Sequence, residues 1–101
     1  MTSSNTLMQA TWNGHVVAES DQTEVVEGNH YFPATSLKQE FFSQTATTTV
    51  CPWKGGSTYY SLTADGTTAT DAAWAYLDPK SAAENIRGHV AFGRDVTVSP
   101  A

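Results

Sequence analysis

Three short segments carry most of the side chains in this chain that could bind or react with a small molecule. They are residues 28–33 (GNHYFP), 51–55 (CPWKG) and 71–74 (DAAW). Together they hold the only Cys, one of three His and two of three Trp. A thiol or an imidazole can act as a nucleophile or base, an ammonium can bind an anion, and an indole can stack on a planar group. No segment matches a motif of known chemistry, so they indicate where the protein acts better than what it does.

The segment around Cys51 predicts the end of a strand that bends into a loop, because it contains a Pro and two Gly. Lys54 is expected to face solvent, where it could bind an anion, and Trp53 could stack on a planar group. Cys51 could be a thiolate activated by a nearby cation. The plain alternatives are a buried Cys51 that acts as a small hydrophobe and a Trp53 that packs in the core or at its rim.

In the segment 28–33, alternation along a strand predicts that His30 and Phe32 share a face opposite Tyr31. His30 could act as a general base or donate a hydrogen bond to a ligand. The alternative is a packed His bonded to a backbone group. The sequence has no Cys pair and no His-x-x-x-His, and it lacks the glycine motifs that bind phosphates. We therefore assign no metal site and no cofactor.

The elements that position these residues are mostly strands joined by tight turns. Asn13-Gly14 and Asp65-Gly66 each lie between strand-like runs, and such dipeptides favour the type I′ turn of a hairpin. The segments expected to form β-structure are a three-stranded meander over 8–27, a hairpin over 57–76 and a last pair of strands over 89–98.

Helix signals are few. Asp78 followed by Pro79 is typical of an N-cap and first helical position, and Gly88 would end a helix of about two turns. Residues 33–40 are expected to form either another turn of helix or a loop. The predicted fold class is mainly β with one or two short helices.

The hairpin over 57–76 gives a register that can be checked. A two-residue turn at 65–66 predicts that Tyr59 faces Ala72. One face of the hairpin is then small and aliphatic, and aromatic rings among hydroxyl groups on the other suit the wall of a pocket. The aromatic face carries Tyr59, Ser61, Thr63, Thr70, Trp74 and Tyr76. Asp71 falls on the aliphatic face, so we expect it to be capped, paired or outside the hairpin.

Length and charge limit the function classes. The 101 residues predict a single β-rich domain over 8–98 with flexible ends at 1–7 and 99–101. Ten acidic and five scattered basic residues give a net charge of −5, which disfavours nucleic acid and an anionic membrane as partners. No apolar run is long enough to span a bilayer, and the N-terminus does not look like a secretory signal. A single Cys fits a reducing compartment, so we expect a cytoplasmic protein.

The motifs also occur in an order that resembles a known family. In sequence they are WNG (12–14), AES (18–20), VEGNHYFP (26–33), CPWKG (51–55), YY (59–60), DG (65–66), DAAW (71–74) and VAF (90–92). Over about residues 8–98 this pattern resembles the bacterial and fungal family called domain of unknown function 427. Gly93 departs from it, because a Trp or Tyr is usual there, so a pocket is expected to be less aromatic at that edge.

The resemblance implies a β-tent fold, related to Mss4-like and methionine-sulfoxide-reductase-B-like domains. Relatives in that fold hold a structural zinc with paired Cys, and the single Cys implies no zinc here. One classification labels the family nucleotidyltransferase-like. Such enzymes need closely spaced carboxylates for magnesium, and the sequence offers little support for them.

The preferred interpretation is a non-enzymatic or weakly enzymatic domain that binds a small planar or sugar-like molecule. The predicted binding residues are His30, Tyr31, Trp53, Lys54, Tyr59, Trp74 and Tyr76. One alternative is an enzyme that uses Cys51, His30 and Lys54, or a nucleotidyltransferase-like activity. Another is a structural or interaction module in which Trp53 and Trp74 are deeply buried with no cavity beside them. The ligand, the presence of any catalysis and the oligomeric state stay open.

Overall fold

The computed structural model describes residues 6–101 and is mainly β, as the sequence predicts. The strands are β1 (Met8–Trp12), β2 (His15–Ser20), β3 (Glu24–Val26), β4 (Asn29–Tyr31), β5 (Phe42–Cys51), β6 (Gly55–Ala64), β7 (Thr67–Ala75), β8 (Val90–Phe92) and β9 (Thr97–Pro100). Three short 3₁₀ helices complete the fold: η1 (Ala34–Ser36), η2 (Gln39–Phe41) and η3 (Ser81–Ile86). Among the described residues, no helix has the length and apolar character needed to cross a membrane.

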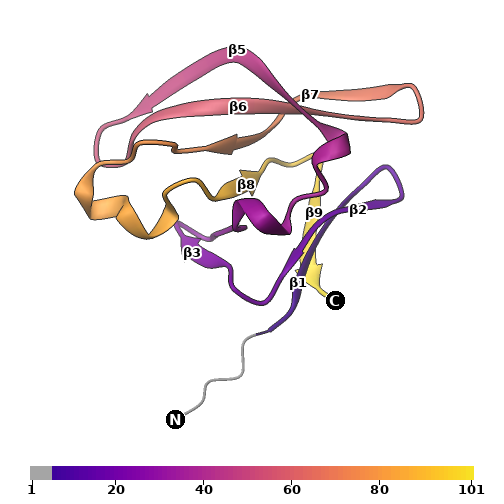
Figure 1. The fold of residues 1–101 in the computed structure, drawn as a ribbon, viewed down its shortest axis with the longest axis horizontal. Helices are drawn as coiled ribbons and strands as arrows, with labels where there is room; N and C mark the ends of the chain where they lie inside the picture. Colours follow the sequence, from indigo (N-terminus) through magenta and orange to yellow (C-terminus); the bar gives the residue numbers. More distant parts are fainter. Residues whose placement is uncertain (1–5) are drawn as a thin grey trace.

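The strands form three antiparallel sheets, with orders β5-β6-β7-β8, β2-β1-β9 and β3-β4. In Figure 1 the long strands β5, β6 and β7 form the upper layer, and the two small sheets lie below it. The main core fills the space between the four-stranded sheet and β1 and β2, and Phe32 and Phe92 pack in it with ring centroids 5.6 Å apart. A second cluster, of Tyr31, Tyr76, Ala83, Ile86 and Ala91, lies beside η3.

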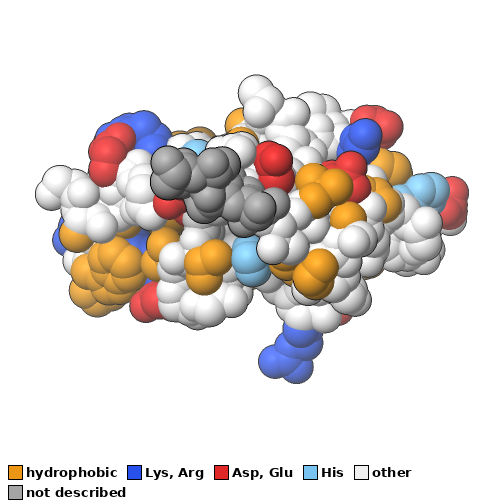
Figure 2. Space-filling model, turned by 90° about the horizontal axis from the view of Figure 1, so that it is seen from below, with side chains coloured by type: hydrophobic (Ala, Val, Ile, Leu, Met, Phe, Trp, Pro, Cys, Tyr) orange, Lys and Arg blue, Asp and Glu red, His pale blue; other side chains and the backbone are white. Residues whose placement is uncertain are grey.

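The surface keeps a few large apolar side chains, which are Leu7, Val25, Val50, Trp53 and Leu77. On the face shown in Figure 2, hydrophobic side chains form separate groups with polar groups between them. Scattered exposed apolar residues of this kind are ordinary for a small domain.

The two predicted hairpin turns are confirmed, but the predicted meander is wrong. Asn13 and Gly14 have φ of 51° and 80° and join β1 to β2. Glu27 and Gly28 form a further turn of the same kind, with φ of 53° and 80°, and this turn pairs β3 with β4 instead of with β2. A Glu-Gly dipeptide is a weaker turn signal than Asn-Gly, which is why the sequence did not indicate this hairpin.

The predicted last pair of strands is also wrong. β8 pairs with β7, whereas β9 crosses to the other sheet and pairs with β1. Ser99 and Pro100 therefore belong to a strand, where a flexible end was expected, and the Ala101 N–H donates to the Leu7 carbonyl at 2.8 Å. Of the predicted flexible N-terminus 1–7, residues 1–5 lie outside the described part of the chain.

The predicted helix after Asp78 starts later and is not an α-helix. η3 begins at Ser81, and its cap position is occupied by Lys80 without a side-chain cap. The cause is that the Lys80 N–H donates to the Lys54 carbonyl at 2.9 Å, which ties residues 78–80 to the β5-β6 turn. Residues 33–40, for which a helical turn or a loop was expected, contain η1 and the start of η2.

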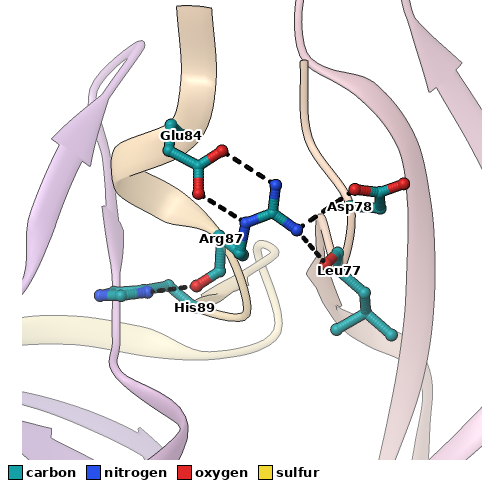
Figure 3. Close-up of polar contacts among 5 residues, drawn as sticks. All are labelled: Leu77, Asp78, Glu84, Arg87 and His89. Atoms are coloured by element: carbon teal, nitrogen blue, oxygen red, sulfur yellow. Dashed lines mark hydrogen bonds and ion pairs between the residues drawn. The ribbon is translucent and has the colours of Figure 1, made fainter. Parts of the chain in front are cut away.

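Asp78 acts in an ion-pair network rather than as a cap. Figure 3 shows the Arg87 guanidinium between Glu84, at 2.5 and 2.9 Å, and Asp78, at 3.2 Å. Hydrogen bonds to Glu84 and then Asp78 raise the pKa of Arg87, and the same contact lowers the pKa of Glu84. The network fixes η3 against the segment that follows β7, and Gly88 follows with a φ of 70°.

The hairpin over 57–76 has the predicted faces but not the predicted pairing. Leu62 faces Ala69 as expected, but the register then shifts by two residues, so Tyr59 faces Trp74 rather than Ala72. The cause is a bulge at Asp71, which has a φ of 53°. Because the shift is even, Tyr59 and Trp74 still share one face of the sheet.

The side chain of Asp71 explains why the bulge is stable. The Asp71 carboxylate accepts hydrogen bonds from Thr45 at 2.6 Å and Thr47 at 2.7 Å, and the Asp71 N–H donates to Ser61 Oγ at 3.1 Å. The two threonine hydrogen bonds lower the pKa of this carboxyl group. Asp71 is thus paired, one of the three arrangements the sequence allowed, and it links β7 to β5 across β6.

Candidate functional site

Lys54 lies against two of the aromatic residues that the sequence singled out, Trp53 and Tyr76. It is buried, with 5 % of its surface exposed, so the expectation of a solvent-facing Lys54 is wrong. Its ammonium forms an ion pair with Glu27 and lies 4.9 Å from the centre of the Trp53 ring and 5.5 Å from that of Tyr76. Cations at these distances from aromatic rings are stabilised by the ring electrons.

The charged forms of Lys54 and Glu27 stabilise each other. Burial works to lower the pKa of Lys54, but the hydrogen bond to Glu27 and the nearby Tyr76, Tyr31 and Cys51 outweigh it and leave the pKa above its ordinary value. Hydrogen bonds from Lys54 and then Trp53 lower the pKa of Glu27. The ammonium is therefore charged at neutral pH, and the Glu27 carboxylate already neutralises it.

Tyr76 and Tyr31 connect this cation to Trp74. Its indole N–H donates to Tyr31 Oη at 3.2 Å, and its ring lies 6.2 Å from that of Tyr59. Tyr31 and Tyr76 are buried with ring centroids 6.5 Å apart. The aromatic group, as we call this set, comprises Tyr31, Trp53, Lys54, Tyr59, Trp74 and Tyr76. The structure thus brings together six of the seven predicted residues.

A hollow of about 410 Å³ lies beside Trp74. The residues that line it are Met8, Gly28, Asn29, His30, Trp74, Phe92, Gly93, Arg94, Val96 and Val98. Of the seven predicted residues, His30 and Trp74 line the hollow, and Tyr31, Trp53, Lys54, Tyr59 and Tyr76 do not. The rings and the ammonium therefore do gather, but they pack against one another and leave the hollow beside them.

His30 reaches the hollow from β4. Its Nδ1 is hydrogen-bonded to Thr23 Oγ1 at 2.9 Å, and its side chain is half-buried. The hydrogen-bond partner of His30 is therefore a side chain, whereas the alternative interpretation of His30 predicted a backbone group. Because Nδ1 is used, Nε2 is the ring nitrogen left for a ligand.

Cys51 lies at the end of β5, half-buried against the aromatic group. Burial works to raise the pKa of its thiol, but the backbone N–H groups of Lys54 and Trp53 and the Lys54 charge outweigh it and leave the pKa below its ordinary value. The turn that follows β5 thus favours the thiolate, which is the reactive form of a cysteine.

Comparison with known proteins assigns the chain to a family. Residues 1–99 match the sequence profile of a family described as a domain of unknown function, DUF427. The chain belongs to the DUF427 family. No curated protein matches it significantly. The resemblance seen in the motifs is confirmed, and no activity comes with the family description.

Several residues around the hollow of this DUF427 domain were not indicated by the sequence. Arg94 follows Gly93 in a segment that predicted only a turn, and Val96 follows that turn at the start of a predicted strand. Met8 and Val98 meet there because β9 pairs with β1, a contact between the two ends of the chain. Gly93 was the one available signal, since it departs from the pattern that the chain resembles.

Among the described residues, Asp65 and Asp71 each have a partner within the domain. Asp65 lies at a hairpin tip, bonded to His15 at 2.8 Å, and Asp71 is held by two threonines. Within residues 6–101, no three His, Cys, Asp or Glu side chains lie close enough to hold a metal ion. Trp53, which a purely structural module would bury, is 39 % exposed.

Proposed function

We propose that this DUF427 domain binds a small molecule with a flat apolar body in the hollow beside Trp74. The observation that carries the proposal is the hollow itself, about 410 Å³, with Trp74, Phe92 and aliphatic residues beside polar groups in its wall. Pockets that bind small molecules have this size, and they combine apolar side chains with polar groups that fix the orientation of the ligand.

The surroundings of Trp74 and His30 support the proposal. The Trp74 indole N–H is already bonded to Tyr31, so the ring is held in place and offers a fixed apolar surface. Thr23 fixes His30 in the same way and leaves Nε2 for a hydrogen bond to the ligand. In this proposal Lys54 does not touch the ligand, because it is buried and paired with Glu27. Its ammonium lies against Trp53 and Tyr76 instead.

The test uses indole, a flat and neutral probe, and a variant that fills the hollow. Gly93 lacks a positive φ, and a Cβ built on it lies 3.7 Å from the Trp74 ring, so Gly93→Leu puts a side chain beside that ring. Titration followed by amide NMR should shift the signals of residues 28–30 and 93–94 in the natural protein. The Gly93→Leu variant should lose these shifts.

Gly56→Leu is the matched control, because Gly56 also lacks a positive φ and has open space around it. It should bind indole as the natural protein does. Absence of shifts around the hollow at millimolar indole, or equal shifts in the Gly93→Leu variant, would reject the proposal.

A second candidate function is nucleophilic chemistry at Cys51, which the lowered pKa of its thiol favours. We expect Cys51 of the folded protein to react with iodoacetamide with a midpoint at lower pH than the same chain in urea. The reason is that unfolding removes the backbone N–H groups that stabilise the thiolate. A midpoint that is unchanged by unfolding, or labelling only after unfolding, would exclude this candidate.

A further inference from the structure

The charge around the hollow differs from that of the whole molecule. The chain has ten acidic and five basic residues, yet the hollow is lined by Arg94 and His30 and by no Asp or Glu. An acid-free wall with a guanidinium in a molecule of net charge −5 is a local region suited to a negative ligand.

Among the residues that the structure describes, Arg94 has no partner, unlike most of the cations. Lys54 is paired with Glu27, Arg87 with Glu84 and Asp78, and Lys80 donates to the Pro52 carbonyl. Within residues 6–101, the exposed Arg94 side chain makes no hydrogen bond and no ion pair. Lys38 is the other basic residue without such a contact there, and it does not line the hollow.

From these observations, and resting on the proposed function, we infer that the ligand is a small monocarboxylate with an apolar body. Trp74, Met8, Phe92, Val96 and Val98 supply an apolar wall for the body. The guanidinium of Arg94 binds the carboxylate, because its planar donors match the two oxygens. A single Arg suits one negative charge better than the two of a phosphate group.

The test compares two probes of the same shape, 3-phenylpropionate and its neutral amide, by amide NMR at constant salt. The natural protein should bind the carboxylate about fivefold more tightly than the amide, which is the effect of one charge contact at an exposed rim. Arg94→Gln should remove this difference, because the carboxylate loses its charge contact and binds no more tightly than the amide. Lys38→Gln, which removes the same charge away from the hollow, should preserve the difference.

The outcomes separate this inference from the proposed function. Equal affinity for the acid and the amide, with both lost in Gly93→Leu, would overturn the inference and leave the proposed function in place. Absence of binding by either probe and by indole would reject the proposed function and the inference with it. Inorganic phosphate that shifts the same signals at equal or lower concentration would overturn the assignment to a carboxylate.

Discussion

Replacing Lys54 with Ala should lower the free energy of unfolding by about 3 kcal/mol, the range found for truncated buried side chains. The long side chain of Lys54 fills space between Trp53 and Tyr76, and its ammonium is held by Glu27. Truncation removes both the packing of the stem and the charge contacts. Urea unfolding followed by tryptophan fluorescence measures the change.

Lys54→Met is the control for this prediction, because it keeps the apolar stem and removes the charge. It should lower the free energy of unfolding clearly less than Lys54→Ala does. Glu27 is about half exposed, so water can solvate its carboxylate once the Lys54 ammonium is gone. Equal losses in the two variants would show that the charge, not the packed stem, stabilises this region. No loss in Lys54→Ala would contradict the buried position of the side chain.

The same ion pair predicts the pH dependence of stability. The pKa of Glu27 is lowered in the folded state, so its contribution is present above the ordinary carboxyl pKa and is lost as the pH falls through the folded value. The pKa of Lys54 is raised, so its contribution is lost only as the pH rises through that raised value. Glu27→Gln should therefore lose less stability on acidification than the natural protein. Asp71 and Glu84, whose pKa values are also lowered, leave the variant with some acid sensitivity.

Replacing Phe32 with Ala should have the largest effect on stability, about 4 kcal/mol. Phe32 is fully buried, and its backbone exchanges hydrogen bonds of 2.7 and 2.8 Å with Val90 of β8. It follows β4, which is three residues long and carries His30 and Tyr31. A loss of this size is a large part of the total stability of a small domain.

Thermal unfolding measures this effect, with Phe32→Leu as a control that should cost about 1 kcal/mol because it keeps most of the apolar volume. The amide signals of residues 29–31 should broaden or shift in Phe32→Ala, since the ring anchors the short strand that ends at the hollow. A Phe32→Ala protein with unchanged melting temperature and unchanged signals would show that β4 is held mainly by β3.

Local signals predicted the parts of this fold that depend on neighbouring residues. The Asn13-Gly14 and Asp65-Gly66 turns were predictable because few dipeptides accept positive φ at both positions. The crossing of β9 to β1 was not, because it is set by packing between distant parts of the chain. The start of the helix after Asp78 was predicted too close to the N-terminus for the same reason. The contact with Lys54 overrides a good N-cap sequence.

The candidate site was predictable to a similar extent. Alternation along β6 and β7 was enough to place Tyr59 and Trp74 on one face, although the bulge at Asp71 changed their pairing. The environment of Lys54 was not predictable, because its partner Glu27 lies in a turn that the sequence did not indicate. The hollow depends on β1, β4, β8 and β9 meeting, so Met8, Arg94, Val96 and Val98 carried no local signal.

The hydrogen bonds of Asp71 have a consequence for the outer edge of the large sheet. β5 is an edge strand of ten residues, rich in threonine and mostly exposed, and it pairs with β6 at both ends but not between Gln44 and Thr48. Asp71 holds Thr45 and Thr47 in that interval, so the strand bows at its middle, as Figure 1 shows. A strand from another molecule would find two short stretches rather than one straight edge. By holding the middle of β5 away from β6, the Asp71 carboxylate therefore disfavours aggregation by addition of a strand to this edge.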